Sequence, residues 1–215
     1  MADDGEITIE GAYTGSTKFR LYTVTFFGTP ISVTVTSNPS AVSKWVRKTV
    51  FFHRRRREPM VVGTGVQWTA FHGSSSPAQT LHLCVGTRCL IFQLYRADRV
   101  PLSLRKFLYH TGNTFVGLWN GSDQRKLYES EHVVGIHDLL DLRKYAEADD
   151  GRSLRGASAE EIVREVLGYE GVRLEKEISL SDWGRRDLGR DQVMQACVDA
   201  YVSFRIGRDL RAWEL

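Results

Sequence analysis

Two aspartates in the sequence stand in settings where a carboxylate could do chemistry. Asp123 follows the apolar stretch Thr114–Leu118 and a turn of small residues, near the start of an expected helix. Asp199 borders the apolar face of a second expected helix, over residues 190–210. A carboxylate beside a buried face needs a cation, a metal ion or a hydrogen-bond donor as its partner. Taken singly, Asp123 could equally be a first-turn acid that offsets the helix dipole, and Asp199 a surface acid at the edge of the apolar stripe.

A third stretch, Met60–Phe71 (MVVGTGVQWTAF), predicts a buried strand with unusual residues near its end. Gly65 and Gln67 are two positions apart, and on a strand such positions point to the same face. Two carboxylates in this arrangement could bind a hard metal ion, whereas glycine offers no ligand and glutamine offers only a neutral carbonyl oxygen. The strand therefore has the spacing of a metal site without its charge.

Clustered cations and an aromatic residue suggest a second kind of chemistry, the binding of phosphate. Arg54–Arg57 is the densest run of charge, and it indicates either a phosphate contact or nuclear-import signal, or the solvated end of a helix. Arg125 and Lys126 come shortly after Asp123 and could also contact phosphate. Trp119 lies between the apolar strand and Asp123, where it could stack on a base or pack in the core.

The elements that must position these residues follow from hydrophobic spacing and turn residues. Phe19–Gly28 and Ile31–Thr36 predict a hairpin, and Asn38-Pro39 predicts the start of a helix. Three strand-like runs with short turns then predict an antiparallel meander: Val61–Thr69, Thr80–Val85 and Cys89–Leu94. The remaining predictions are a helix at 102–109, a strand at 114–118, a helix at 123–131, a strand at 133–138, and helices at 139–148, 158–167 and 190–210. This order predicts an α/β protein, in which helices cover a mixed sheet made of an antiparallel meander followed by parallel strands.

Composition and charge set the broad class of the protein. The chain has 215 residues and a net charge of +3, so any affinity for nucleic acid needs a local patch. We expect an N-terminal arm over residues 1–18 and a single domain over residues 19–215. The three cysteines lack the spacing of a zinc site or a disulfide framework, and no run approaches the ~18 apolar residues of a membrane span. We therefore expect an intracellular protein, in the nucleus or the cytoplasm, with no membrane partner.

In their order along the chain, these stretches resemble the 3′-5′ exonuclease domain of the DEDD superfamily. The resemblance is to its tyrosine-containing group, in the Werner-syndrome-helicase-like branch, and especially to small stand-alone plant proteins of that kind. It extends from about Tyr22 to Gly207 and is carried by MVVGTGVQW, LHLCVGTRCLIFQL, TFVGLWNGSDQRKL, DLLDLRKYA and LSDWGRRDLGRDQVMQACVDAYVSFRIG. The resemblance implies an RNase H-like core, a five-stranded mixed sheet flanked by helices.

The departures from the family pattern fall on its catalytic positions. The first family motif has an Asp and a Glu where this chain has Gly65 and Gln67, and the third motif has a Tyr where this chain has Gln195. The Asp of the second motif matches Asp123, and the Asp of the third motif matches Asp199. Two of four carboxylates therefore remain, and the tyrosine is replaced.

The family chemistry implied by the resemblance is phosphodiester hydrolysis by two Mg²⁺ or Mn²⁺ ions clamped between carboxylates. With two carboxylates left, we expect at most one weakly bound metal ion, held by Asp123 or Asp199. The favoured interpretation is a pseudo-nuclease, a catalytically impaired or inactive family member that binds DNA or RNA. The alternatives are a residual metal-dependent 3′-5′ exonuclease and a scaffold for a protein partner or a homo-oligomer.

Overall fold

A mixed β-sheet forms the centre of the protein in the computed structural model, which describes residues 6–16, 18–56, 58–71 and 74–215. The sheet has eight strands in the order β1-β2-β3-β8-β7-β4-β9-β10. In chain order these strands are β1 (Ile7–Ser16), β2 (Phe19–Phe26), β3 (Thr29–Thr36), β4 (Met60–Gln67), β7 (Thr80–Val85), β8 (Arg88–Phe92), β9 (Asn113–Gly117) and β10 (Leu139–Asp141). Strands β5 (Ala70–Phe71) and β6 (Ser74–Ser75) form a separate two-stranded ribbon.

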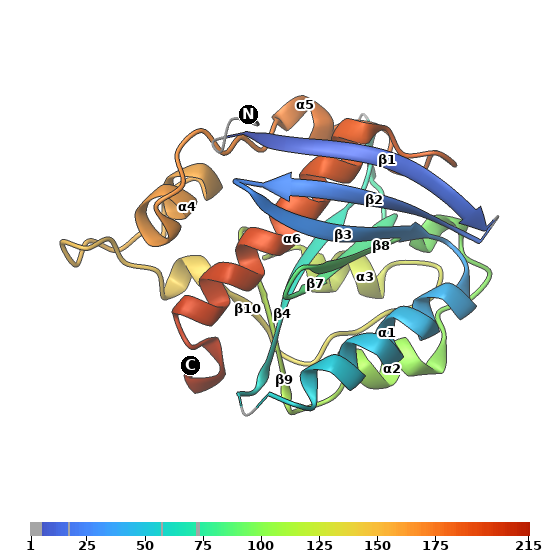
Figure 1. Ribbon diagram of the computed structural model, residues 1–215, viewed down its shortest axis with the longest axis horizontal. Helices are drawn as coiled ribbons and strands as arrows, with labels where there is room; N and C mark the ends of the chain where they lie inside the picture. The colour runs from blue at the N-terminus through green and yellow to red at the C-terminus, as the bar shows by residue number, and fades with distance from the viewer. Residues whose placement is uncertain (1–5, 17, 57, 72–73) are drawn as a thin grey trace.

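Helices cover both faces of this sheet, as Figure 1 shows. They are α1 (Pro39–His53), α2 (Leu102–Leu108), α3 (Asp123–Tyr128), α4 (Ala159–Leu167), α5 (Lys176–Ser179) and α6 (Arg190–Asp209), with 3-10 turns at Leu94–Arg96, Leu142–Lys144 and Ala212–Glu214. One apolar cluster joins α1 and α2 to one face of the sheet, and a second joins α6 and α4 to the other face. None of the helices in the described part of the chain has the length and apolarity needed to cross a membrane.

The α/β class and the mixed character of the sheet are confirmed. Strands β4, β7 and β8 form the predicted antiparallel meander, and β9 and β10 add to β4 in parallel. The predicted hairpin is formed by β2 and β3, and β3 pairs with β8 in parallel. Helix α1 begins as predicted, because the Asn38 side chain accepts hydrogen bonds from the backbone N–H groups of Ser40 and Ala41.

Four sequence predictions about the fold are corrected by the structure. The sheet has eight strands instead of five, and residues 7–16 of the expected N-terminal arm form its edge strand β1. The strand predicted at 133–138 is irregular, and the predicted helix at 139–148 is instead the short strand β10 followed by a 3-10 turn. These errors have one cause: the weak local signals of β1 and β10 become strands only through hydrogen bonds to distant neighbours.

Close packing of α6 on β4 positions the residues of interest. A Cβ on Gly63 would lie 1.9 Å from the carbonyl oxygen of Ala200 and 2.5 Å from the backbone nitrogen of Phe204. A Cβ on Gly207, one helical turn further along α6, would likewise lie too close to the side chain of Val116 on β9. These glycines let the helix backbone approach the sheet more closely than any side chain would allow. Asp199, on the turn before this contact, therefore lies directly over Gly65 of β4.

Candidate functional site

A cleft of about 310 Å³ lies at the carboxyl ends of the parallel strands β4 and β9. Its walls come from β4 and the residues after it, the β9–α3 connection, the start of α4, the segment around α5, and α6. The lining residues are Val66, Gln67, Trp68, Leu118, Trp119, Asp123, Ala159, Leu174, Ser179, Leu180, Gln195 and Asp199. The structure thus brings together five residues predicted from three separate stretches: Gln67, Trp119, Asp123, Gln195 and Asp199.

Gly65 lies beneath the cleft, covered by the carboxylate of Asp199. A Cβ on Gly65 would lie 2.5 Å from Oδ2 of Asp199 and 3.4 Å from its Cγ. The space that an aspartate side chain would need at position 65 is therefore already filled by the carboxylate from α6. Glycine at this position has a packing role, because it allows Asp199 to rest on the strand.

Burial governs the ionisation of both carboxylates in the cleft. Asp123 is 7% exposed, and burial raises its pKa well above the usual value, with further increases from the nearby charges of Asp199 and Asp141. Burial also raises the pKa of Asp199, to about 7, with a smaller contribution from Cys89. Each carboxylate therefore holds its proton at a higher pH than an aspartate in water would.

His82 is a buried neighbour of this pair that sequence reasoning missed. It sits on β7 opposite Gly65, and its Nδ1 lies 3.2 Å from where a Cβ on Gly65 would be. Its Nε2 is 2.9 Å from the hydroxyl of Thr80, whereas Nδ1 has no hydrogen-bond partner within the described residues. Burial lowers the pKa of His82 to about 3, so the imidazole is neutral at physiological pH. The cross-strand register places it here, and no local sequence signal specifies that register.

Gln195, at the family's tyrosine position, holds the segment around α5 in place. Its Oε1 accepts a hydrogen bond from the backbone nitrogen of Glu175 at 2.7 Å. Its Nε2 donates to the carbonyl oxygen of Glu175 at 3.1 Å and to the Ser179 hydroxyl at 2.7 Å. With its amide committed to these bonds, Gln195 is a structural link between α6 and the wall of the cleft.

Replacing Gln195 with alanine is expected to lower the free energy of unfolding by roughly 1–3 kcal/mol, because it leaves backbone groups of Glu175 without partners. Urea denaturation would measure this loss. Gln124→Ala is a matched control, since Gln124 is exposed and donates a single hydrogen bond, to the carbonyl of Ile136. Equal, small losses in the two variants would contradict the role assigned to Gln195.

Trp119 lies at the mouth of the cleft and is not part of the core. Its side chain is 55% exposed, and its backbone adopts a left-handed conformation with φ of 55°. The guanidinium of Arg143 stacks on the indole ring at 3.6 Å from its centroid. Asp141 holds this guanidinium by hydrogen bonds to its Nε and NH2 groups. Asp141 lies near the motifs in the sequence, but the sequence gives no geometric reason to place it in the site, and the stretch that contains Asp141 and Arg143 was predicted as a helix.

The predicted basic residues do not gather at the cleft. Lys126 is 1% exposed, and its ammonium donates to the carbonyl oxygen of Ser76, so this side chain is covered and its phosphate contact stays a prediction. Arg125 is exposed and pairs with Glu129 at 3.3 Å. Arg54, Arg55 and Arg56 are exposed at the far end of β4, and Arg57 lies outside the described residues.

The donor set of the cleft does not fit two divalent metal ions. Two-metal hydrolysis relies on several carboxylates to offset the charge of the ions. The cleft offers the carboxylates of Asp123 and Asp199 and the neutral amide of Gln67. Across the described ranges, no three His, Cys, Asp or Glu side chains are arranged to hold a metal ion.

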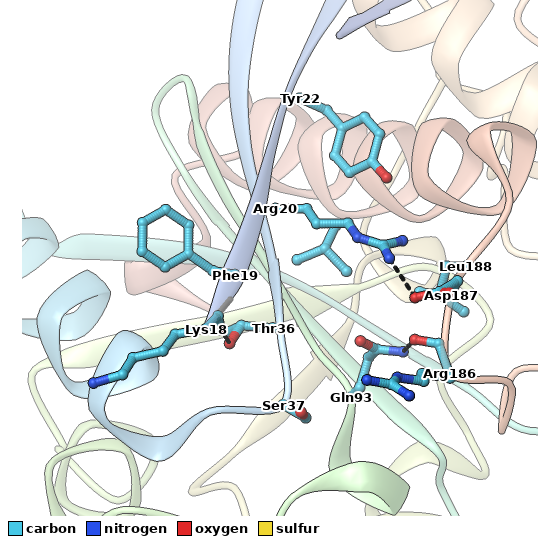
Figure 2. A pocket seen from close by; sticks show the side chains of 11 residues that line it. Lys18, Phe19, Arg20, Tyr22, Thr36, Ser37, Gln93, Arg186, Asp187 and Leu188 are labelled. Carbon is cyan, nitrogen blue, oxygen red and sulfur yellow. Dashed lines mark hydrogen bonds and ion pairs between the residues drawn. The ribbon is translucent and has the colours of Figure 1, made fainter. Parts of the chain in front are cut away.

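A second cavity, of about 450 Å³, lies at the carboxyl ends of β3 and β8 and contains none of the predicted site residues. Figure 2 shows Arg20 paired with Asp187 across it, at 2.5 Å, with Arg186 below them near Gln93. Because the only carboxylate of this cavity is paired with one of its arginines, the cavity offers little chemistry of its own.

The curated proteins that the chain resembles are named 3′-5′ exonucleases. No family model matches the chain. A curated protein of Drosophila virilis named 3′-5′ exonuclease is 22% identical over 220 residues, which covers 100% of this chain and 64% of that protein. The chain thus spans less than two thirds of that relative's length.

Two solved structures share the fold. Escherichia coli RNase D, described as an exoribonuclease involved in structured RNA processing, aligns with a TM-score of 0.65 and 16% identity, over 83% of this chain and 44% of that one. The EXO domain of Aedes aegypti Nibbler aligns with a TM-score of 0.64 and 13% identity, over 84% of this chain and 89% of that one.

Proposed function

We propose that this chain, which carries a 3′-5′ exonuclease domain of the DEDD superfamily, works by binding nucleic acid and has lost most or all of the family's hydrolytic chemistry. The spacing of Gln195 and Asp199, which mirrors the Tyr and Asp of the third motif, supports a place in the Werner-like branch. The nucleic acid that this domain binds is DNA or RNA.

The observation that carries the loss of chemistry is the packing of Asp199 onto Gly65. An aspartate at position 65 would be the carboxylate shared by both metal ions in the family arrangement, and its place is filled by the carboxylate of Asp199. Gln67 contributes no charge, and the amide of Gln195 is committed to Glu175 and Ser179. The effects of changes within one catalytic unit on the rate are not additive, because a single loss already removes most of the rate.

Binding of nucleic acid is supported by the walls of the same cleft. Trp119 presents an exposed indole at the mouth, and Trp68, directly after β4, also lines the cleft. Stacking of a base on an aromatic side chain contributes roughly 1–3 kcal/mol and accepts any base. Burial also raises the pKa values of Asp123 and Asp199, which weakens their repulsion of phosphate near neutral pH.

The test combines degradation and binding on the same samples. End-labelled single-stranded DNA, recessed-end DNA and RNA are incubated with the protein and Mg²⁺ or Mn²⁺, and gel shifts are run over a range of salt. We expect intact substrate and a shift that weakens steeply as salt rises. Trp119→Ala should weaken binding about tenfold, whereas Tyr128→Ala, which removes an exposed aromatic residue outside the cleft lining, should not.

The outcomes separate the three functions. Laddering from the 3′ end that disappears in Asp123→Asn/Asp199→Asn would establish a residual metal-dependent exonuclease and overturn the proposal. Intact substrate without any shift would instead favour a protein-interaction or homo-oligomeric scaffold. A shift that is insensitive to salt would also count against binding through phosphates.

A further inference from the structure

The positive charge of the protein is concentrated in α1 and the residues that follow it. Residues 39–59 contain seven Lys or Arg and one acid, a net charge of +6, so the rest of the chain has a net charge of −3. The cations of this segment that the structure describes are all exposed: Lys44, Arg47, Lys48, Arg54, Arg55 and Arg56. A near-neutral protein thus carries a local basic surface of the kind that attracts polyanions.

Exposed aromatic rings lie within this basic surface. Phe51 and Phe52, on the last turn of α1, are 42% and 56% exposed. The guanidinium of Arg54 lies 4.1 Å from the centroid of the Phe51 ring, and that of Arg88 lies 5.6 Å from the Phe52 ring. Two adjacent exposed phenylalanines, each flanked by an arginine, form a surface on which flat rings can stack.

A small pocket beside Phe52 contains an arginine whose buried N–H group has no hydrogen-bond acceptor among the described residues. It encloses about 130 Å³ between the end of α1, the β7–β8 turn and the end of α6, and its lining includes Arg56, Arg88 and Arg208. Arg208 is paired with Glu58 at 2.7 Å. The Nε of Arg88 is buried and has no hydrogen-bond partner within the described part of the chain. A bound phosphate oxygen would supply the acceptor that this group lacks.

This surface is remote from the cleft. The α1 helix leads into the amino end of β4 (Figure 1). The cleft lies at the carboxyl end of that strand. The eight residues of β4 span about 23 Å from first to last, at ~3.3 Å per residue. The cleft and the pocket beside Phe52 share no lining residue, so they are separate sites.

We propose that the surface formed by Phe51, Phe52, Arg54, Arg55, Arg56 and Arg88 is a second binding site for single-stranded nucleic acid. Unpaired bases stack on the two rings, and a backbone phosphate enters the pocket at Arg88. A duplex fits less well, because its bases are stacked internally and leave the two rings without partners. The inference rests on the proposed function only in taking nucleic acid as the ligand, and it assigns a site distinct from the cleft.

The test measures fluorescence anisotropy of labelled oligo-dT and oligo-U, each in a short form of about 6 nucleotides and a long form of about 20. Phe51→Ala/Phe52→Ala should weaken binding of both lengths about tenfold, and Arg88→Ala should reduce the salt slope by about 0.7, as the loss of one phosphate contact predicts. Tyr95→Ala is the matched control, because Tyr95 is 57% exposed with the Arg96 guanidinium 5.5 Å from its ring, at the other end of the sheet. Thermal unfolding of each variant checks that the fold is retained.

Comparison with the cleft variant Trp119→Ala makes the two proposals separable. Losses in both variants support both sites, and a loss only in the phenylalanine variant supports this inference while contradicting binding in the cleft. A loss only in Trp119→Ala overturns the inference and leaves the proposed function standing. Binding to phosphatidylserine vesicles without binding to either oligonucleotide would overturn both and identify the surface as a membrane contact.

Discussion

Restoring the two carboxylates that the resemblance implies, as Gly65→Asp with Gln67→Glu, is expected to create a site for two divalent metal ions, which the donor set of the natural cleft does not fit. The variant would bring four carboxylates to the cleft together with Asp123 and Asp199, which is the charge that two hard cations require. With Mn²⁺ at about one hundred times its dissociation constant, binding to the folded state alone would stabilise the variant by about 2.7 kcal/mol. The natural chain should gain much less, and titration calorimetry or thermal unfolding with and without Mn²⁺ measures the difference.

Without metal the same variant should be less stable than the natural chain. The new side chain at position 65 displaces the carboxylate of Asp199, since its Cβ would otherwise lie 2.5 Å from Oδ2, and the added charges repel one another. Gly65→Ala is the matched control, because it adds the Cβ without a ligand. It should lose about 1–3 kcal/mol of stability through overpacking, and Mn²⁺ should not restore it. Equal Mn²⁺ stabilisation of the natural chain and the restored variant would show that two carboxylates already suffice.

Replacing Asp199 with asparagine is expected to stabilise the protein strongly at pH 8 and little at pH 5. The pKa of Asp199 is about 7 in the folded protein, compared with about 3.9 for an aspartate in an unfolded chain. Between these values the folded state holds a proton that the unfolded state releases, so stability falls as pH rises through this window. The full loss, reached above pH 7, is up to roughly 4 kcal/mol, and asparagine avoids it.

Urea denaturation of Asp199→Asn and the natural chain at both pH values measures this effect as a difference between two curves. The lowered pKa of His82 acts in the opposite direction, because it makes the fold less stable as pH falls from about 6.5 toward 3. Comparing Asp199→Asn with the natural chain removes this contribution, since both contain His82. Asp209→Asn is the control, because Asp209 is exposed at the end of the same helix. Parallel stability curves for Asp199→Asn and the natural chain would mean that Asp199 is ionised at neutral pH without cost.

Features encoded by local sequence were predicted well. Asn38 and Ser158 cap their helices with side-chain oxygens, as their positions before α1 and α4 indicate. The apolar runs of β4, β7, β8 and β9 are strong enough to specify strands without their neighbours. Strands β1 and β10 were not found, because their residues acquire a strand conformation only by pairing with β2 and β9. Local propensity carries no information about such partners.

The residues of the candidate site were likewise predicted from the sequence only in part. The three stretches and their resemblance to the exonuclease domain together selected Gln67, Asp123, Gln195 and Asp199, which the fold then gathers in one cleft. Sequence reasoning did not find His82 behind Gly65 and gave no geometric reason to place Asp141 behind Trp119, because both come from strands whose register the sequence does not reveal. Sequence reasoning also could not tell that Lys126 is buried while Phe52 is exposed. Helix periodicity shows which residues share a helix face, but not which other segments cover that face.

The sequence by itself determined the chemical inventory of this protein: an exonuclease-type order of motifs, two carboxylates where the family has four, and a basic segment after residue 38. The tertiary structure alone decided that Asp199 occupies the space above Gly65, that Gln195 is bound to Glu175, and that the basic segment and the cleft lie at opposite ends of β4. The physical reason is that burial, pKa and hydrogen-bond partners depend on contacts between segments far apart in the chain, and only the packing of α6 on the sheet creates those contacts.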